Sequence, residues 1–172
     1  TQQQGRVARA LRKLLNVPEA QIPEVAEKLA EEKRLLEKEV NSLKSKVALT
    51  GISELLAQAD EVEGVSVLAK EIKVDSADTL RNIGHSIREQ FSSGIAWLAA
   101  TMNGKSTIIC VVSDDLIERG IKASDMVNEL AMLADGRGGG KPNMAQAGIK
   151  APEKLSGALA AATKIVREKL AN

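Results

Sequence analysis

The segment IAWLAATMNGKSTIICVV, residues 95–112, decides the fold of this chain. In it, two apolar runs flank the dipeptide Asn103-Gly104. This dipeptide is a strong hairpin signal, because both residues readily adopt the positive φ angles that a two-residue turn requires. The segment therefore predicts two antiparallel strands, Ile95 to Met102 and Thr107 to Val112, joined by a tight turn.

Upstream of this hairpin, the sequence predicts another strand and a crossover helix. The strand lies between Val65 and Val74, and Ser76 or Asp75 serves as the N-cap of the helix that follows. Apolar residues then recur at helical spacing: Leu80, Ile83, Ile87 and Phe91. A strand–helix–strand unit predicts that the first two strands are parallel and joined by a right-handed crossover.

Downstream of the hairpin, helices predominate. Ser113-Asp114-Asp115 caps a short helix that ends at Gly120, Ser124-Asp125 caps a second one, and Pro152 opens a last one. Residues 61–172 are therefore expected to form a globular α/β or α+β domain, in which helices pack against a short mixed sheet.

The first 60 residues are predicted to form a separate helical arm, either a long helical hairpin or a coiled coil. A short helix should end at Asn16-Val17-Pro18, because proline disfavours helix at the residue before it. A longer helix follows from Pro23 to about residue 59, with apolar residues alternating four and three apart. The seam residues expected to mediate dimerisation are Leu29, Leu36, Val40, Leu43 and Val47. The alternative is that this seam packs onto the following domain of the same chain.

Composition restricts the classes of function. The 172 residues carry a net charge of only +1, with one phenylalanine, one tryptophan and no tyrosine. Bases of single strands are commonly held by aromatic stacking, so a module that reads single-stranded sequence is not expected. No apolar stretch is long enough for a membrane span, no secretory signal is present, and a single cysteine fits a reducing compartment. From these features we expect a cytoplasmic or organellar protein. Because the chain opens with Thr1 and not with methionine, we also expect it to be a piece of a longer polypeptide.

The most informative motif is GRGGGKPNMAQAG, residues 136–148, within a glycine-rich loop expected at 135–149. Glycine lets the backbone N–H groups approach a ligand, and such groups bind anions. Arg137, Lys141 and Lys150 add positive charge, and no acidic residue lies from Gly136 to Lys150. The segment therefore predicts a phosphate-binding loop. A flexible connector is the alternative.

Two nucleotide-binding motifs are excluded. A P-loop requires glycine where Asp135 stands, and serine or threonine where Pro142 stands. A dinucleotide fingerprint opens a helix after a strand, whereas this segment follows a predicted helix, and Lys141 replaces its third glycine.

Catalytic and metal-binding constellations are not expected. His85 is the only histidine and lies on the polar side of a predicted helix, as a surface histidine would. Cys110 lies within a predicted strand and is interpreted as a core residue, and Asp114-Asp115 as a helix cap. Zinc coordination would require further histidine or cysteine ligands.

Residues 136–148 resemble the signature Gly-Gly-Lys-Gly-Gly-Gly-Arg-Pro-Asp-Met-Ala-Gln of the C-terminal domain of alanyl-tRNA synthetases. That domain belongs to a wider group named for its link to DHH phosphoesterases. The resemblance extends back through Ile121-Lys122-Ala123 to the segment from Val65. Residues 14–19, followed by Pro23, are similar to that family's helix break.

The chain departs from this signature at several positions. Asp135-Gly136 replaces a glycine pair, Arg137 replaces lysine, and Lys141 and Asn143 replace arginine and aspartate. Lysine keeps the charge but lacks the two-pronged contact that arginine makes with phosphate. Binding is therefore expected to persist with altered strength.

The resemblance implies a non-catalytic region of an alanine–tRNA ligase. In that family it dimerises, binds the outer corner of alanine tRNA, and helps aminoacylation and editing act on one tRNA. No cofactor is implied for this region, whereas ATP, magnesium and zinc are implied for the parent enzyme. The residues expected to contact RNA are Arg137, Gly138, Gly139, Gly140, Lys141, Asn143, Gln146 and Lys150. The alternatives are an accessory domain of a DHH-type phosphoesterase and a purely structural dimerisation module.

Overall fold

The computed structural model describes the backbone of residues 1–172, and the side chains of residues 1–43 and 50–172. The chain divides into two compact units, Thr1–Ala48 and Leu49–Asn172. The boundary expected from sequence was residue 60, which is twelve residues later. The difference arises because Ile52, which is 3% exposed, packs with the partly buried Leu55 and Leu56 in a core of the second unit.

The first unit is helical. Helix α1 (Gln2–Leu15) is followed by a 3-10 turn (Glu19–Gln21), and α2 spans Ile22–Leu56, so that its last residues belong to the second unit. Between α1 and the turn, Asn16 adopts a left-handed φ of 53°, a common helix-ending conformation. The predicted helix break at residues 16–18 is thereby confirmed.

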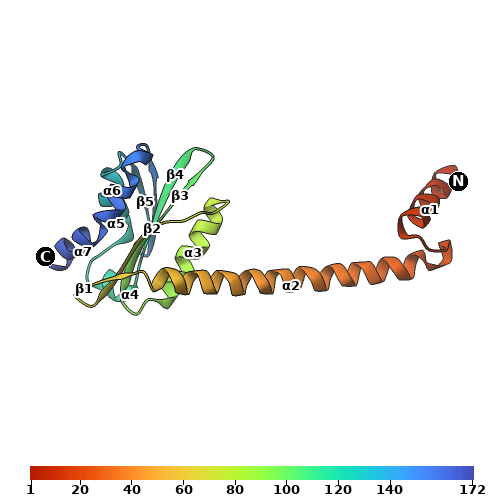
Figure 1. Ribbon diagram of the computed structural model, residues 1–172, viewed down its shortest axis with the longest axis horizontal. Coiled ribbons are helices and arrows are strands. Elements are labelled where there is room, and N and C mark those ends of the chain that lie inside the picture. Colours follow the sequence, from red (N-terminus) through yellow and green to blue (C-terminus); the bar gives the residue numbers. More distant parts are fainter. The chain divides into compact units, whose positions relative to one another are not determined.

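The second unit contains a six-stranded mixed sheet in the order β1-β2-β3-β4-β6-β5 (Figure 1). Its strands are β1 (Asp60–Val62), β2 (Val65–Glu71), β3 (Gly94–Met102), β4 (Lys105–Val112), β5 (Arg137–Gly140) and β6 (Met144–Ile149). β2 and β3 are parallel, and the other neighbours are antiparallel. The predicted parallel pairing of the first two strands and the Asn103-Gly104 hairpin are both confirmed, whereas β1, β5 and β6 were not predicted.

Helices cover both faces of the sheet (Figure 1). They are α3 (Ala77–Gln90), α4 (Asp114–Glu118), α5 (Ala123–Met132), a 3-10 turn (Pro152–Lys154), α6 (Leu155–Ala160) and α7 (Ala162–Leu170). Ser76 caps α3, as predicted, by accepting a hydrogen bond from the Thr79 backbone N–H at 3.1 Å. The α5 cap is Lys122 and not the predicted Ser124-Asp125, because α5 already begins at Ala123. None of the helices among the described residues has the length and apolar character that a membrane span needs.

The core has two halves, one on each face of the sheet. Alternate residues of β4 separate them, with Cys110 in the half that includes residues of α5, α6 and α7, and Ile109 in the half that includes residues of α3 and α2. Trp97 is fully buried, and its indole N–H donates to the Met126 carbonyl at 3.2 Å.

The glycine-rich segment is not the loop that the sequence suggested. Residues 137–140 form β5 at the edge of the sheet, and only residues 141–143 connect it to β6. The physical reason is that β6 alternates buried and exposed residues and pairs with β4 along its whole length. Glycine has little strand propensity, so β5 forms because it pairs with the well-packed β6.

Candidate nucleic-acid interface

The β5–β6 hairpin is held by hydrogen bonds on several sides. The Ala123 backbone N–H donates to the Pro142 carbonyl at 2.7 Å, and that of Val112 to the Asn143 carbonyl at 3.1 Å. On the outer edge of β5, the Gly138 N–H donates to Asn128 Oδ1 at 2.9 Å. The alternative interpretation of this segment as a flexible connector is therefore wrong.

These bonds also revise the predicted use of the glycine backbone. The N–H of Gly136 donates to the Ala131 carbonyl, and that of Lys141 to the Met144 carbonyl, in addition to the bond from Gly138. Several N–H groups of the segment are thus committed to the fold. An anion-binding site in this segment would therefore depend mainly on side chains and on the exposed surface of the strand.

Two glycines of β5 are required by close approach. A Cβ atom on Gly138 would lie 1.9 Å from the Gln146 carbonyl oxygen, and one on Gly140, whose φ is +155°, would lie 2.7 Å from Ala145 Cα. Gly139 differs, because a Cβ atom there would meet no heavy atom within 4 Å. The strand is consequently packed on one side and open on the other.

The open side of the hairpin faces the same way as α3. Arg137 pairs with Gly148, and Gly139 pairs with Gln146, so these residues share one side of the pleated sheet. We call this surface the hairpin face and define it as Arg137, Gly139, Lys141, Gln146 and Gly148, all of which are exposed. It combines two cations, an amide and bare backbone.

Between the hairpin face and α3 lies a cleft of about 340 Å³, which we call the α3 cleft. Helix α3 can approach the sheet closely because Gly84 faces Ile109 and Met144, where even a Cβ atom would be 2.5 Å from Ile109 Cδ1. The cleft is lined by Arg81, His85, Ile109, Gly139, Gly140, Lys141, Asn143, Met144, Ala145 and Gln146.

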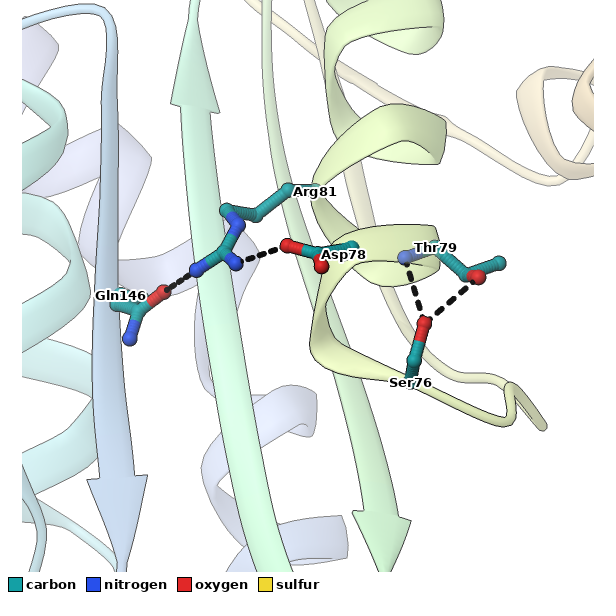
Figure 2. Close-up of polar contacts among 5 residues, drawn as sticks. All are labelled: Ser76, Asp78, Thr79, Arg81 and Gln146. Atoms are coloured by element: carbon teal, nitrogen blue, oxygen red, sulfur yellow. Dashed lines mark hydrogen bonds and ion pairs between the residues drawn. The ribbon is translucent and has the colours of Figure 1, made fainter.

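Arg81 connects the two walls of this cleft (Figure 2). Its Nη1 donates to Gln146 Oε1 at 3.1 Å, across a separation of 65 residues in sequence. Its Nη2 forms a short hydrogen bond and ion pair with Asp78, one turn earlier on α3. The guanidinium group is therefore oriented toward β6.

The nearest carboxylate in sequence to the glycine segment is neutralised by an ion pair. Lys154 Nζ lies 2.6 Å from Asp135 Oδ2. The hydrogen bond and the charge of Asp135 raise the pKa of Lys154 above its ordinary value. Asp135 thus opposes the charge of the hairpin face less than an unpaired carboxylate would.

The α3 cleft brings together five of the residues expected to contact RNA: Gly139, Gly140, Lys141, Asn143 and Gln146. The other three, Arg137, Gly138 and Lys150, are exposed but do not line it. Sequence reasoning missed Arg81 and treated His85 only as a surface residue. Their spacing of four residues on the polar side of α3 was the available signal, since such positions share one helix face.

Cys110 and Asp114 take part in contacts that stabilise the fold. Cys110 is fully buried, and burial raises the pKa of its thiol. Asp114 forms an ion pair with Arg88.

The expected dimerisation residues Leu29, Leu36, Val40 and Leu43 are between 46% and 60% exposed within this chain. The side chain of Val47 lies outside the described residues.

Residues 64–168 match the DHHA1 domain family. The chain is 37% identical over 165 residues to an alanine–tRNA ligase of Chloroflexus aurantiacus, covering 96% of the chain. It is 36% identical over 157 residues, or 91% of the chain, to that of Alkaliphilus metalliredigens. The chain spans 18% of the length of each of these relatives.

Among solved structures, the chain is similar to the C-Ala domain from Aquifex aeolicus alanyl-tRNA synthetase. The TM-score is 0.57 at 23% identity, with 67% of this chain and 99% of that domain covered. This similarity concerns the fold. The hairpin, the sheet and the sequence match together define a DHHA1-type domain.

The chain belongs to the DHHA1 domain family. The curated relatives named above are alanine–tRNA ligases. The resemblance to the C-terminal region of alanyl-tRNA synthetases, drawn from residues 136–148, is thereby confirmed.

Proposed function

We propose that this chain binds tRNA through the hairpin face, as part of a larger alanine–tRNA ligase. The observation that carries the proposal is the gathering of Arg137 and Lys141 on an exposed strand surface, in a segment without acidic residues from Gly136 to Lys150. Cations on an exposed surface can contact the phosphates and 2′-hydroxyls through which proteins bind A-form RNA. The names of the relatives support tRNA as that RNA.

The chain is proposed to act as a binding module without chemistry of its own. A contact with the outer corner of alanine tRNA would raise the effective concentration of that tRNA at aminoacylation and editing sites elsewhere in the enzyme. We propose that those other regions of the enzyme use ATP, magnesium and zinc. From the same proposal we expect the chain to act in the cytoplasm or in an organelle.

The RNA-binding proposal is tested by reversing charge on the hairpin face. The double variant Arg137→Glu/Lys141→Glu should bind alanine tRNA at least about tenfold more weakly than the unmodified chain at physiological salt, with a shallower salt dependence. Filter binding measures the affinity, and circular dichroism with Trp97 fluorescence verifies the fold.

The matched control is Lys164→Glu/Arg167→Glu on α7, a helix of the opposite core half, where both residues are exposed. Equal affinity of the hairpin-face variant and the unmodified chain would refute the proposal. Equal weakening by both double variants would mean that only net charge matters.

We further propose that the helical unit mediates homodimerisation. Helix α1 has no buried residue, and apolar side chains of α2 remain exposed within one chain at coiled-coil spacing, among them Leu36 and Val40. Leu36→Glu/Val40→Glu should shift sedimentation from dimer to monomer. Leu35→Glu is the matched control, because Leu35 is similarly exposed but lies off the seam. A monomeric unmodified chain at tens of micromolar would contradict the proposal.

A further inference from the structure

The α3 cleft has the chemistry of an anion site. Its side-chain donors come from two elements, with Arg81 and His85 on α3, and Lys141, Asn143 and Gln146 on the hairpin and its turn. None of the lining residues described is acidic. A volume of about 340 Å³ lies at the lower end of the range for small-ligand sites, enough for one sugar–phosphate unit.

Two hydrogen bonds hold the guanidinium group of Arg81 at the α3 cleft and leave other donors for such a ligand. A guanidinium carries five N–H donors, of which Gln146 and Asp78 each occupy one in the contacts described here. Holding Arg81 against β6 reduces the side-chain entropy that ordering it on binding would otherwise cost. The bond to Gln146 is therefore a positioning contact for the anion-binding group.

Asp78 already contacts the guanidinium group that a phosphate would bind. Its side chain is 82% exposed, and it is the acidic partner of Arg81. An exposed pair three residues apart on a helix contributes little to stability, so an incoming phosphate can replace the carboxylate at small cost. Carboxylate and phosphate present similar oxygen pairs to arginine.

We propose that the α3 cleft binds a phosphodiester group of the tRNA backbone, with Arg81 as its principal contact and Asp78 as an internal competitor for the same guanidinium. This inference rests on the proposed function and extends it from the hairpin face to α3. It assigns opposite effects on affinity to the two members of one ion pair. A purely structural ion pair would not have that property.

The test uses the full chain, alanine tRNA and the four members of a double-mutant cycle. Arg81→Ala should weaken binding about tenfold, because charged hydrogen bonds to phosphate are lost. Asp78→Asn should tighten binding two- to fivefold, because the competitor is removed. In the Arg81→Ala background, Asp78→Asn should change affinity by less than twofold, since the two residues act through one contact. Arg167→Ala on α7 is the control for loss of one cation.

Three outcomes would overturn the inference. Arg81→Ala could bind as tightly as the unmodified chain. Asp78→Asn could weaken binding, as a structural pair would require. Asp78→Asn could tighten binding equally with and without Arg81, which would indicate a general charge effect. If Arg81→Ala has no effect while Arg137→Glu/Lys141→Glu weakens binding, the hairpin face remains the site and only the α3 cleft is excluded. If neither has an effect, the proposed function also fails.

Discussion

The two sides of β5 differ in how closely neighbouring atoms approach the backbone, although all four residues of the strand are exposed. On the side of α5, Gly138 and Gly140 lie against Ala145 and Ala147, with backbone atoms closer than any side chain would permit. On the side of α3, Gly139 lies between Arg137 and Lys141 and is open to solvent. One short glycine run therefore serves packing and exposure at the same time.

This comparison shows that a glycine-rich motif need not be a loop. Successive residues of a strand point to opposite faces of the sheet. In a single segment, the residues on one face can therefore stabilise the fold while those on the other face contact a ligand. In β5 the even positions are structural, because they permit close approach to β6. The odd positions Arg137 and Gly139 remain available for binding, and Gly140 at the end of the strand also lines the α3 cleft.

The largest difference between the two sides is expected for Gly138→Ala. The added methyl group would lie 1.9 Å from the Gln146 carbonyl oxygen, a backbone atom that can move only with the strand. Overpacking of this kind should reduce the free energy of unfolding by about 3 kcal/mol. Urea denaturation followed by Trp97 fluorescence measures the change. A loss below about 0.5 kcal/mol would mean that the edge strand shifts freely.

A smaller effect is expected for Asn128→Ala, which acts on the outer edge of β5. Asn128 Oδ1 accepts the Gly138 N–H at 2.9 Å, and its amide donates to the Ser124 carbonyl at 2.9 Å. Loss of the acceptor should cost about 0.5–1.5 kcal/mol, the net contribution of one hydrogen bond, because the exposed Gly138 N–H can bind water instead. Hydrogen exchange of the Gly138 amide should also accelerate.

The control for that substitution is Asn128→Asp, which keeps an oxygen acceptor for Gly138 while losing the donor to Ser124. It should protect the Gly138 amide better than Asn128→Ala does. If both variants exchange this amide equally fast, the Asn128 contact does not hold the edge of β5.

The fold was largely accessible from the sequence, because its signals are local. Asn103-Gly104 joins two apolar runs, Ser76 caps a helix, and Pro18 breaks one, each within a few residues. The boundary at residue 60 differed from the observed division after Ala48, because the burial of Ile52 depends on contacts distant in sequence. The helical spacing of Ile52, Leu55, Leu56 and Ala59 indicates an apolar face, but it does not identify what that face packs against.

The candidate site was only partly accessible, for the same reason. The glycine motif drew attention to residues 136–150, but its strand conformation is imposed by β6 and by bonds such as the one from Asn128. The spacing of Arg81 and His85 indicates a shared helix face, but the contact of Arg81 with Gln146, 65 residues away, depends on how α3 packs on the sheet. Spacing indicates which residues share a helix face, but it does not identify the distant residues that this face contacts.

The smallest change in stability is expected for Gly139→Ala, the matched counterpart of Gly138→Ala on the open side. An added methyl group would meet no heavy atom within 4 Å, so the free energy of unfolding should change by less than about 0.5 kcal/mol. The methyl group would, however, project from the hairpin face at the rim of the α3 cleft. Affinity for alanine tRNA should therefore fall by a few fold while the denaturation curve stays in place. Unchanged affinity together with unchanged stability would show that RNA does not contact the odd positions of β5, and the separation of roles by parity would be wrong.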